Sequence, residues 1–176
     1  MDVVDAQIHC WEVHPTRPWD PAFNYGTDRE HPWPVEYALA AMDLIGIAGA
    51  VISLPPSYRS PIGGGVHRYD NSYAEEAVLR YPGRFATVQR WDPRDPGINR
   101  LAAEALSRPG TVGVRATLVA EAEWKLFRAG GYEPLFAAAE GTPSGFRGLA
   151  QVALPGATRL PDHVTAARAA DEPGLG

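Results

Sequence analysis

The sequence predicts an α/β protein in which β-strands and α-helices alternate along the chain. Four short segments have the apolar, β-branched composition of buried parallel strands, at residues 3–9, 49–54, 85–88 and 112–118. The segments between them are long enough to carry the chain back to the start of the next strand, and they show helical periodicity. This order of elements predicts a parallel sheet whose strands are joined by helices.

The helices are predicted from apolar residues that recur at intervals of three and four positions. Pro34 and Gly46 suit the start and the end of the first helix. Ser72 and Glu75 have capping-box spacing at the start of the second. The predicted helices are residues 34–46, 72–81, 98–105 and, as the beginning of a fourth, 132–140.

Two long connections interrupt this order. Residues 11–33 are rich in proline and tryptophan, and a connection of that length usually has a function. Residues 55–69 contain three consecutive glycines, Gly63, Gly64 and Gly65, without the helix signal that follows a phosphate-binding loop. We interpret the second connection as a flexible loop rather than a ligand cradle.

Two arrangements of parallel strands fit this pattern, an open doubly wound sheet and a closed TIM (β/α)8 barrel. A dinucleotide-binding open sheet would place a tight Gly-rich turn directly after its first strand. Here His9 and Trp11 lead into a long connection instead, which favours the barrel. Because a TIM barrel needs about 250 residues, we expect a partial barrel with about the first four β-α units.

The composition favours work on small molecules. The 16 Lys and Arg residues are outnumbered by 21 Asp and Glu residues, and the net charge of −5 argues against a nucleic-acid-binding surface. No apolar run approaches the ~18 residues of a membrane span, and the N-terminus does not resemble a signal peptide. A single cysteine, Cys10, cannot form an internal disulfide, so we expect a cytoplasmic protein with a small-molecule substrate.

The first candidate for chemistry is His9, which closes the first predicted strand. Active sites of TIM barrels lie at the C-terminal ends of the strands. An imidazole at that position can ligate a metal or polarise a carbonyl oxygen. On its pattern alone, the same residue is also explained as a structural or solvated histidine.

Several short motifs occur in the order of a known family. Residues 5–11, Asp-Ala-Gln-Ile-His-Cys-Trp, resemble the opening of the amidohydrolase-related family. This branch of the amidohydrolase superfamily includes 2-pyrone-4,6-dicarboxylate lactonases and aminocarboxymuconate-semialdehyde decarboxylases. The resemblance covers roughly residues 2–140, with further matching stretches at residues 40–43, 70–73, 81–85, 113–115 and 133–136.

The resemblance implies a hydrolase acting on an ester, lactone or amide carbonyl of a small carboxylated substrate. His9 is the implied catalytic residue and the candidate metal ligand. The family usually has a second histidine where this chain has Gln7, and a carboxamide is a weak zinc ligand, so zinc is left unassigned. Arg115 is implied to hold a substrate carboxylate, although a salt bridge on the barrel rim would also explain it. Gln7 and Trp11 are the other candidate substrate-binding residues.

The chain is expected to divide into residues 1–140, the N-terminal half of an amidohydrolase-type barrel, and residues 141–176, an irregular tail rich in Ala, Gly, Pro and Arg. Our hypothesis is that the tail is out-of-frame translation or the trace of a truncated gene, and a genuine short variant is the alternative. In the family, further catalytic groups come from later strands. A decarboxylase and a non-catalytic remnant therefore stand beside the hydrolase as alternative functions.

A half-barrel leaves two parallel edges unpaired. Pairing of two such halves would close the ring, so a homo-oligomer is one expected outcome.

Overall fold

A computed structural model describes residues 3–20, 31–105, 107–116, 118 and 120–140. The predicted tail, residues 141–176, lies outside the described residues. The described elements follow one another as β1 (Val3–Ile8), α1 (Val35–Ile45), β2 (Ile47–Ile52), β3 (Arg59–Gly63), β4 (Val66–Tyr69), α2 (Ser72–Arg80), β5 (Phe85–Arg90), α3 (Ile98–Ala105), β6 (Thr111–Arg115), α4 (Glu121–Arg128) and α5 (Glu133–Glu140). None of the described helices is long and apolar enough to span a membrane.

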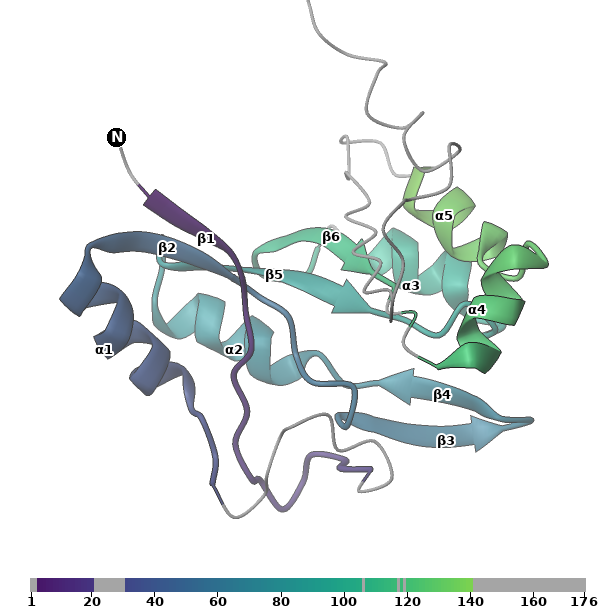
Figure 1. Ribbon diagram of the computed structural model, residues 1–176, viewed down its shortest axis with the longest axis horizontal. Coiled ribbons are helices and arrows are strands. Elements are labelled where there is room, and N and C mark those ends of the chain that lie inside the picture. The colour runs from purple at the N-terminus through teal and green to yellow at the C-terminus, as the bar shows by residue number, and fades with distance from the viewer. Residues whose placement is uncertain (1–2, 21–30, 106, 117, 119, 141–176) are drawn as a thin grey trace, which may run out of the picture.

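The main sheet has four strands in the order β1-β2-β5-β6, and all neighbours are parallel (Figure 1). In its register Ala50 pairs with both Asp5 and Phe85, and Thr87 pairs with Thr111. The helices α1, α2 and α3 lie between successive strands of this sheet in the sequence. The predicted α/β class with a parallel sheet is confirmed, and the carboxyl ends of all four strands meet at one edge.

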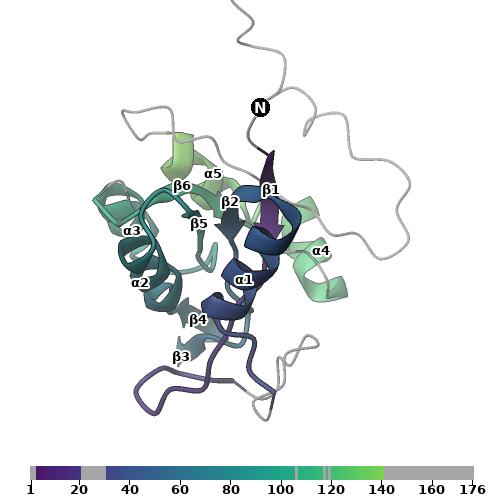
Figure 2. The ribbon, with the colours of Figure 1, turned by 90° about the vertical axis from the view of Figure 1, so that its left-hand side faces the viewer.

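The helices α1 and α2 cover one face of the sheet, as the turned view shows (Figure 2). Ala50 and Ile52 of β2 are almost completely buried in the core cluster on this face. Because side chains alternate along a strand, their neighbours point to the opposite face. The helix residues in the same cluster include Val35, Ala38, Met42, Tyr73, Ala74 and Ala77.

The first helix ends as the sequence predicts. Gly46 has a φ of 77°, and its N–H donates to the carbonyl of Met42, which closes the helix in the left-handed conformation that suits glycine. The second strand then begins at Ile47, two residues earlier than predicted, because Ile47 already pairs with Val3.

The second long connection is not simply a flexible loop, and that prediction is wrong. Residues Arg59–Gly63 and Val66–Tyr69 form an antiparallel hairpin, in which Arg59 pairs with Tyr69. Gly63, Gly64 and Gly65 form its tip with φ values of 103°, 60° and 76°, a region that L side chains rarely adopt. The sequence hides this hairpin because prolines and glycines replace the usual alternation of polar and apolar residues.

The C-terminal part of the described chain contains a helix that the sequence did not predict. After β6, the helix α4 precedes α5, which corresponds to the predicted helix at residues 132–140. Trp124 and Phe127 of α4 are only partly buried against the cluster around Leu118 and Tyr132. None of the α4 residues is fully buried.

Candidate functional site

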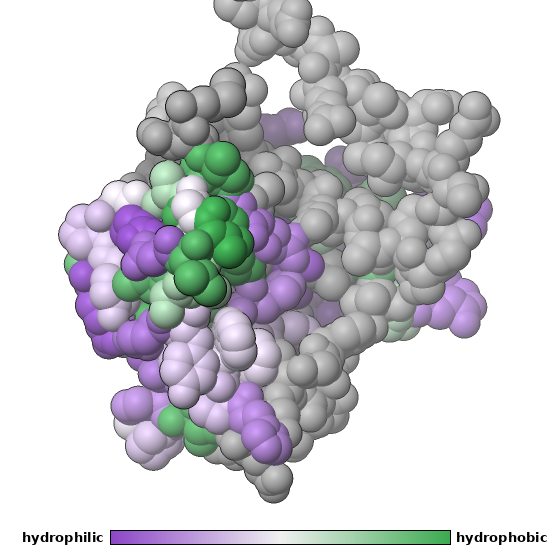
Figure 3. Space-filling view, turned by 60° about the vertical axis from the view of Figure 1, so that its left-hand side comes forward, coloured by the Kyte–Doolittle hydropathy of each residue, from purple (hydrophilic) through white to green (hydrophobic). Residues whose placement is uncertain are grey.

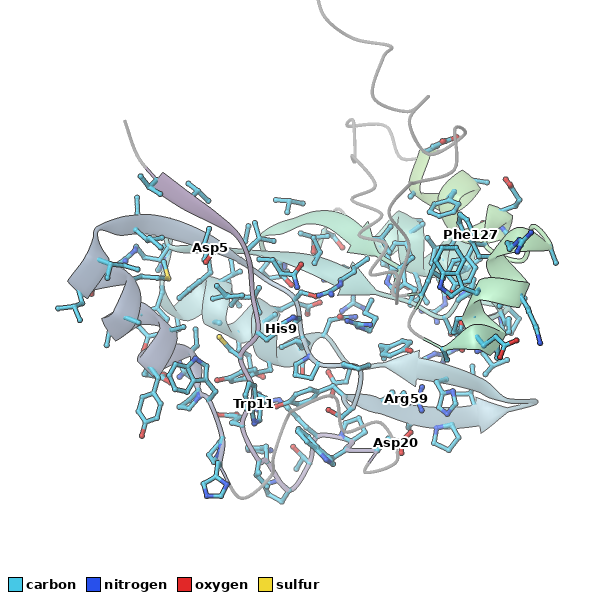
Figure 4. All side chains as sticks on the ribbon, in the orientation of Figure 1. Asp5, His9, Trp11, Asp20, Arg59 and Phe127 are labelled. Atoms are coloured by element: carbon cyan, nitrogen blue, oxygen red, sulfur yellow. The ribbon has the colours of Figure 1, made fainter. Side chains whose placement is uncertain are left out.

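Four polar side chains gather where the parallel strands end. His9 follows β1, Ser53 follows β2, Arg90 closes β5 and Arg115 closes β6. Figure 4 shows His9 at the point where the chain leaves β1 for the first long connection. Since Ile52 points into the helix-covered core, alternation along β2 places Ser53 on the opposite face, where His9 and Arg115 meet it.

His9 is held as a neutral imidazole. Its Nδ1–H donates to the backbone carbonyl of Ser53 at 2.6 Å, because a carbonyl oxygen only accepts. Its Nε2 accepts a hydrogen bond from the side-chain amide of Gln7 at 2.9 Å. Although part of the residue is exposed, burial of the ring lowers the pKa of His9, against the opposite effect of the Ser53 hydrogen bond. The positive charges of Arg115 and Arg90 lower this pKa further.

Arg115 is a buried cation with unused hydrogen-bonding capacity. The residue is 8% exposed, and one terminal nitrogen donates to the Ser53 hydroxyl at 2.6 Å. Its Nε has no hydrogen-bond partner among the described residues. Burial lowers the pKa of Arg115, and no described carboxylate offsets that effect. A guanidinium in this state can gain most from an anionic ligand.

Arg90 lies directly opposite Arg115 in the register of β5 and β6. Its guanidinium donates to the carbonyl of Leu54 at 3.3 Å and lies 5.7 Å from the ring centroid of Tyr69. Burial lowers the pKa of Arg90 to about 10. The Asn71 side chain fixes the backbone here, because its Oδ1 accepts from the Arg90 N–H at 3.0 Å and its Nδ2 donates to the Arg90 carbonyl at 3.3 Å.

A small cavity of about 40 Å³ adjoins this group of side chains. Its walls include Arg90 and Ala116 at the strand ends, together with Arg59, Tyr69 and Tyr132. Arg59 projects from the β3–β4 hairpin and pairs with Asp20 at 2.7 Å, two residues that Figure 4 shows side by side.

A larger cavity of about 240 Å³ lies where the hairpin meets β5 and α3. Arg68 and Arg108 line it, but they are already paired with Asp95 and Glu75 respectively. We therefore place the candidate site at the strand ends, where Arg115 has donors to spare.

The structure brings together three of the four residues that the sequence singled out. The Gln7 side chain is hydrogen-bonded to His9. His9 and Arg115 both donate hydrogen bonds to Ser53, His9 to its carbonyl and Arg115 to its hydroxyl. Trp11 lies further along the first connection. Its backbone N–H donates to the backbone carbonyl of Trp33 at 2.9 Å, and its side chain packs against the core cluster under α1 and α2. A substrate contact for Trp11 stays a prediction.

Sequence reasoning missed Ser53 and Arg90. Arg90 carries the same signal as Arg115, a charged residue that closes an apolar strand, but the predicted strand stopped at residue 88. Ser53 fell within the predicted strand at residues 49–54 and was treated as part of it.

The described residues do not fit a divalent metal at His9. No group of three or more His, Cys, Asp or Glu side chains with metal-binding geometry occurs in this part of the chain. The groups around His9 are the carboxamide of Gln7, a serine and two arginines, and the arginines repel a cation.

Comparison with known proteins supports the fold. No family model matches the sequence, and the search of curated proteins found no match. The fold is similar to that of a probable 2-pyrone-4,6-dicarboxylic acid hydrolase from Acinetobacter baumannii, solved with citric acid bound, with a TM-score of 0.55 and 17% sequence identity. The similarity covers 78% of this chain and 45% of the other, so the chain spans just under half the length of that protein. At this identity the comparison shows a common fold and not a common activity.

Proposed function

We propose that this chain is the N-terminal half of an amidohydrolase-type TIM barrel, with about the first four β-α units. In this proposal it hydrolyses an ester, lactone or amide carbonyl of a small carboxylated substrate. The parallel four-stranded sheet and the similarity to just under half of a probable hydrolase support the proposal. Active groups at the carboxyl ends of the strands agree with the usual site in such barrels.

The observation that carries the proposal is the convergence of His9 and Arg115 on Ser53. With Arg90 opposite Arg115, two buried guanidinium groups lie beside a neutral imidazole. Guanidinium groups match the geometry of carboxylates and bind them with paired hydrogen bonds. The citric acid in the similar structure, a tricarboxylic acid, is consistent with a carboxylate ligand for this chain.

His9 is the proposed base. Because its Nδ1–H is bound to the Ser53 carbonyl, the neutral ring offers the lone pair on Nε2. A water molecule that displaces the Gln7 amide transfers a proton to Nε2 while its oxygen bonds to the substrate carbonyl carbon. The carbonyl oxygen then takes the negative charge, and the new imidazolium stabilises it. The imidazolium finally returns the proton to the leaving oxygen or nitrogen as its bond to carbon breaks.

This scheme refines the role expected from the sequence. Only the protonated form of His9 has an N–H free to polarise a carbonyl, because the Nδ1–H is already used. We therefore assign polarisation to the imidazolium that forms during the reaction, and proton removal to the neutral ring.

The test uses the full chain and two measurements. Citrate binding is measured by calorimetry, and hydrolysis is measured on a panel of carboxylated lactones and amides. We expect Arg115→Met to weaken citrate binding and His9→Ala to abolish hydrolysis while leaving most of the binding intact. Arg80→Met is the matched control, since Arg80 is an exposed arginine on α2 that pairs with Glu36. Turnover that is unchanged in His9→Ala would refute the proposed base.

A second candidate function is carboxylate binding without catalysis. It is favoured by the absence, among the described residues, of an Asp or Glu side chain bonded to His9. Citrate binding that depends on Arg115, with no turnover of any lactone or amide, would select this function. A decarboxylase would instead release carbon dioxide from the same substrates.

A further inference from the structure

Both outer strands of the main sheet have an edge that pairs with no other described strand. Among the described residues, β1 pairs only with β2, and β6 pairs only with β5. The two strands run in the same direction, since every neighbouring pair in the sheet is parallel. A strand that pairs in parallel with β1 therefore has the direction that parallel pairing with β6 also requires.

Apolar side chains are exposed along the β1 edge. Val3 is 58% exposed and Val4 is 59% exposed, although adjacent strand residues point to opposite faces. Leu44 and Ile45 at the end of α1 are exposed nearby, because Val3 pairs with Ile47. We call Val3, Val4, Leu44 and Ile45 the edge patch, and Figure 3 shows hydrophobic residues gathered on the side of the molecule that carries α1. Apolar edges of this kind are usually covered in native proteins.

We propose that two copies of this chain join by their sheet edges, with β1 of each copy pairing with β6 of the other, to form a ring of eight parallel strands. This inference rests on the proposed half-barrel. The two contacts are identical by two-fold symmetry, so neither copy keeps an unpaired edge. Eight parallel strands with helices outside form the closed barrel that the half-barrel lacks.

A second copy fits the edge better than an unrelated partner. It supplies a strand of the required direction at both edges at once, and Val112 on β6, which is 47% exposed, would be covered together with the edge patch.

The ring would also change the candidate site. His9 stands at the end of β1, so pairing of β1 with the other chain's β6 brings Arg115 of the second copy next to it. Neighbouring strands lie about 4.8 Å apart. Each of the two sites would then contain His9 and Ser53 of one copy, flanked by arginines of both.

The first test measures the mass of the full chain in solution by sedimentation and native mass spectrometry. We expect a dimer. Val4→Lys and Val112→Lys should each raise the dimer dissociation constant by about 100-fold or more, because each places a charge in the contact. Leu79→Lys is the matched control, since Leu79 is 66% exposed on α2, away from both edges, and this variant should remain dimeric. Circular dichroism checks that every variant is folded.

The second test maps the contact with a photoreactive amino acid in place of Val4. In a mixture of isotope-labelled and unlabelled chains, we expect crosslinks from Val4 of one chain to residues 111–115 of the other. Crosslinks to residues 141–176 of the same chain would overturn the proposal, because that segment would then cover the edge. A single-chain mass at every concentration, an open series of larger assemblies, or a dimer insensitive to both lysine variants would also overturn it.

The two proposals fail in different ways. A monomer that binds citrate through Arg115 would refute the ring and leave the proposed function standing. A dimer with the expected crosslinks but without citrate binding would support the ring and refute the proposed function.

Discussion

Replacement of Arg115 by methionine should weaken ligand binding without destabilising the fold. Methionine preserves most of the buried aliphatic length but removes the guanidinium. A hydrogen bond to a charged group contributes about 1.5–3 kcal/mol, so the dissociation constant for citrate should rise roughly 10- to 100-fold. The same change removes a buried cation that has no described ion-pair partner, and burial already lowers its pKa.

The stability effect follows from the contacts that Arg115 makes. Arg115 donates a hydrogen bond to the Ser53 hydroxyl, and losing it costs about 1 kcal/mol. Removing an unpaired buried charge contributes in the opposite direction. We therefore expect the free energy of unfolding to stay within about 1 kcal/mol of the wild-type value or to rise.

Calorimetric titration with citrate and urea denaturation measure the two quantities separately. Arg80→Met is the control, because an exposed ion pair such as Arg80–Glu36 contributes only about 0–1 kcal/mol and lies outside the site. Unchanged citrate affinity in Arg115→Met would refute the assigned role. So would a loss of more than about 3 kcal/mol in stability, because that loss would mean that Arg115 is a structural residue.

Two further predictions concern the support of the site, and a third concerns the packing of Gly110. The pKa of His9 in the folded chain lies below the unfolded value of 6.5, so the unfolded chain binds more protons at a pH between the two values. The contribution of His9 to the free energy of unfolding is therefore complete above pH 6.5 and is lost as the pH falls through the folded pKa. Urea denaturation across pH 4 to 8 should show a smaller loss in His9→Asn, and parallel curves would contradict this. Asn71→Ala should lower stability by about 1–3 kcal/mol and weaken citrate binding, since it removes the two buried hydrogen bonds that Asn71 makes to the Arg90 backbone. Unchanged unfolding and affinity would count against this role. Gly110→Ala should cost about 2 kcal/mol or more, because Gly110 has a φ of 61° and an added Cβ would lie 2.6 Å from Val78 Cγ1. Val78→Ala in the same chain should recover part of that loss, and no recovery would mean that backbone strain alone is responsible.

The main sheet could be predicted because its strands are short apolar runs between helices with clear periodicity. The hairpin could not, because Pro61 and the glycines at its tip replace the alternation that marks a strand, and its pairing is set by contacts across the turn. The capping-box prediction at Ser72 also differs from the structure. Asn71 is the N-cap, and its side chain is used by Arg90 rather than by the helix.

The candidate site could be predicted only in part. His9 and Arg115 were found because each closes a predicted strand, a position that can be read locally. Their meeting at Ser53 depends on contacts over 44 and 62 positions of the sequence, which no local pattern contains. The tautomer of His9 is likewise set by the distant Ser53 carbonyl. Only the three-dimensional structure shows that Nδ1 faces a carbonyl, which leaves Nε2 of the neutral ring as the atom to which we assign the proposed proton transfer.

The pairing of Arg90 with Arg115 is the strongest argument that the strand ends serve a ligand. Like charges directly opposite each other on neighbouring strands are destabilising, and these two side chains are also buried. Val114, the neighbour of Arg115 on β6, packs instead in an apolar core cluster. Two adjacent buried arginines are therefore poorly explained by stability alone. In the proposed function, a carboxylate ligand between them would offset the repulsion and accept a hydrogen bond from the free Nε of Arg115.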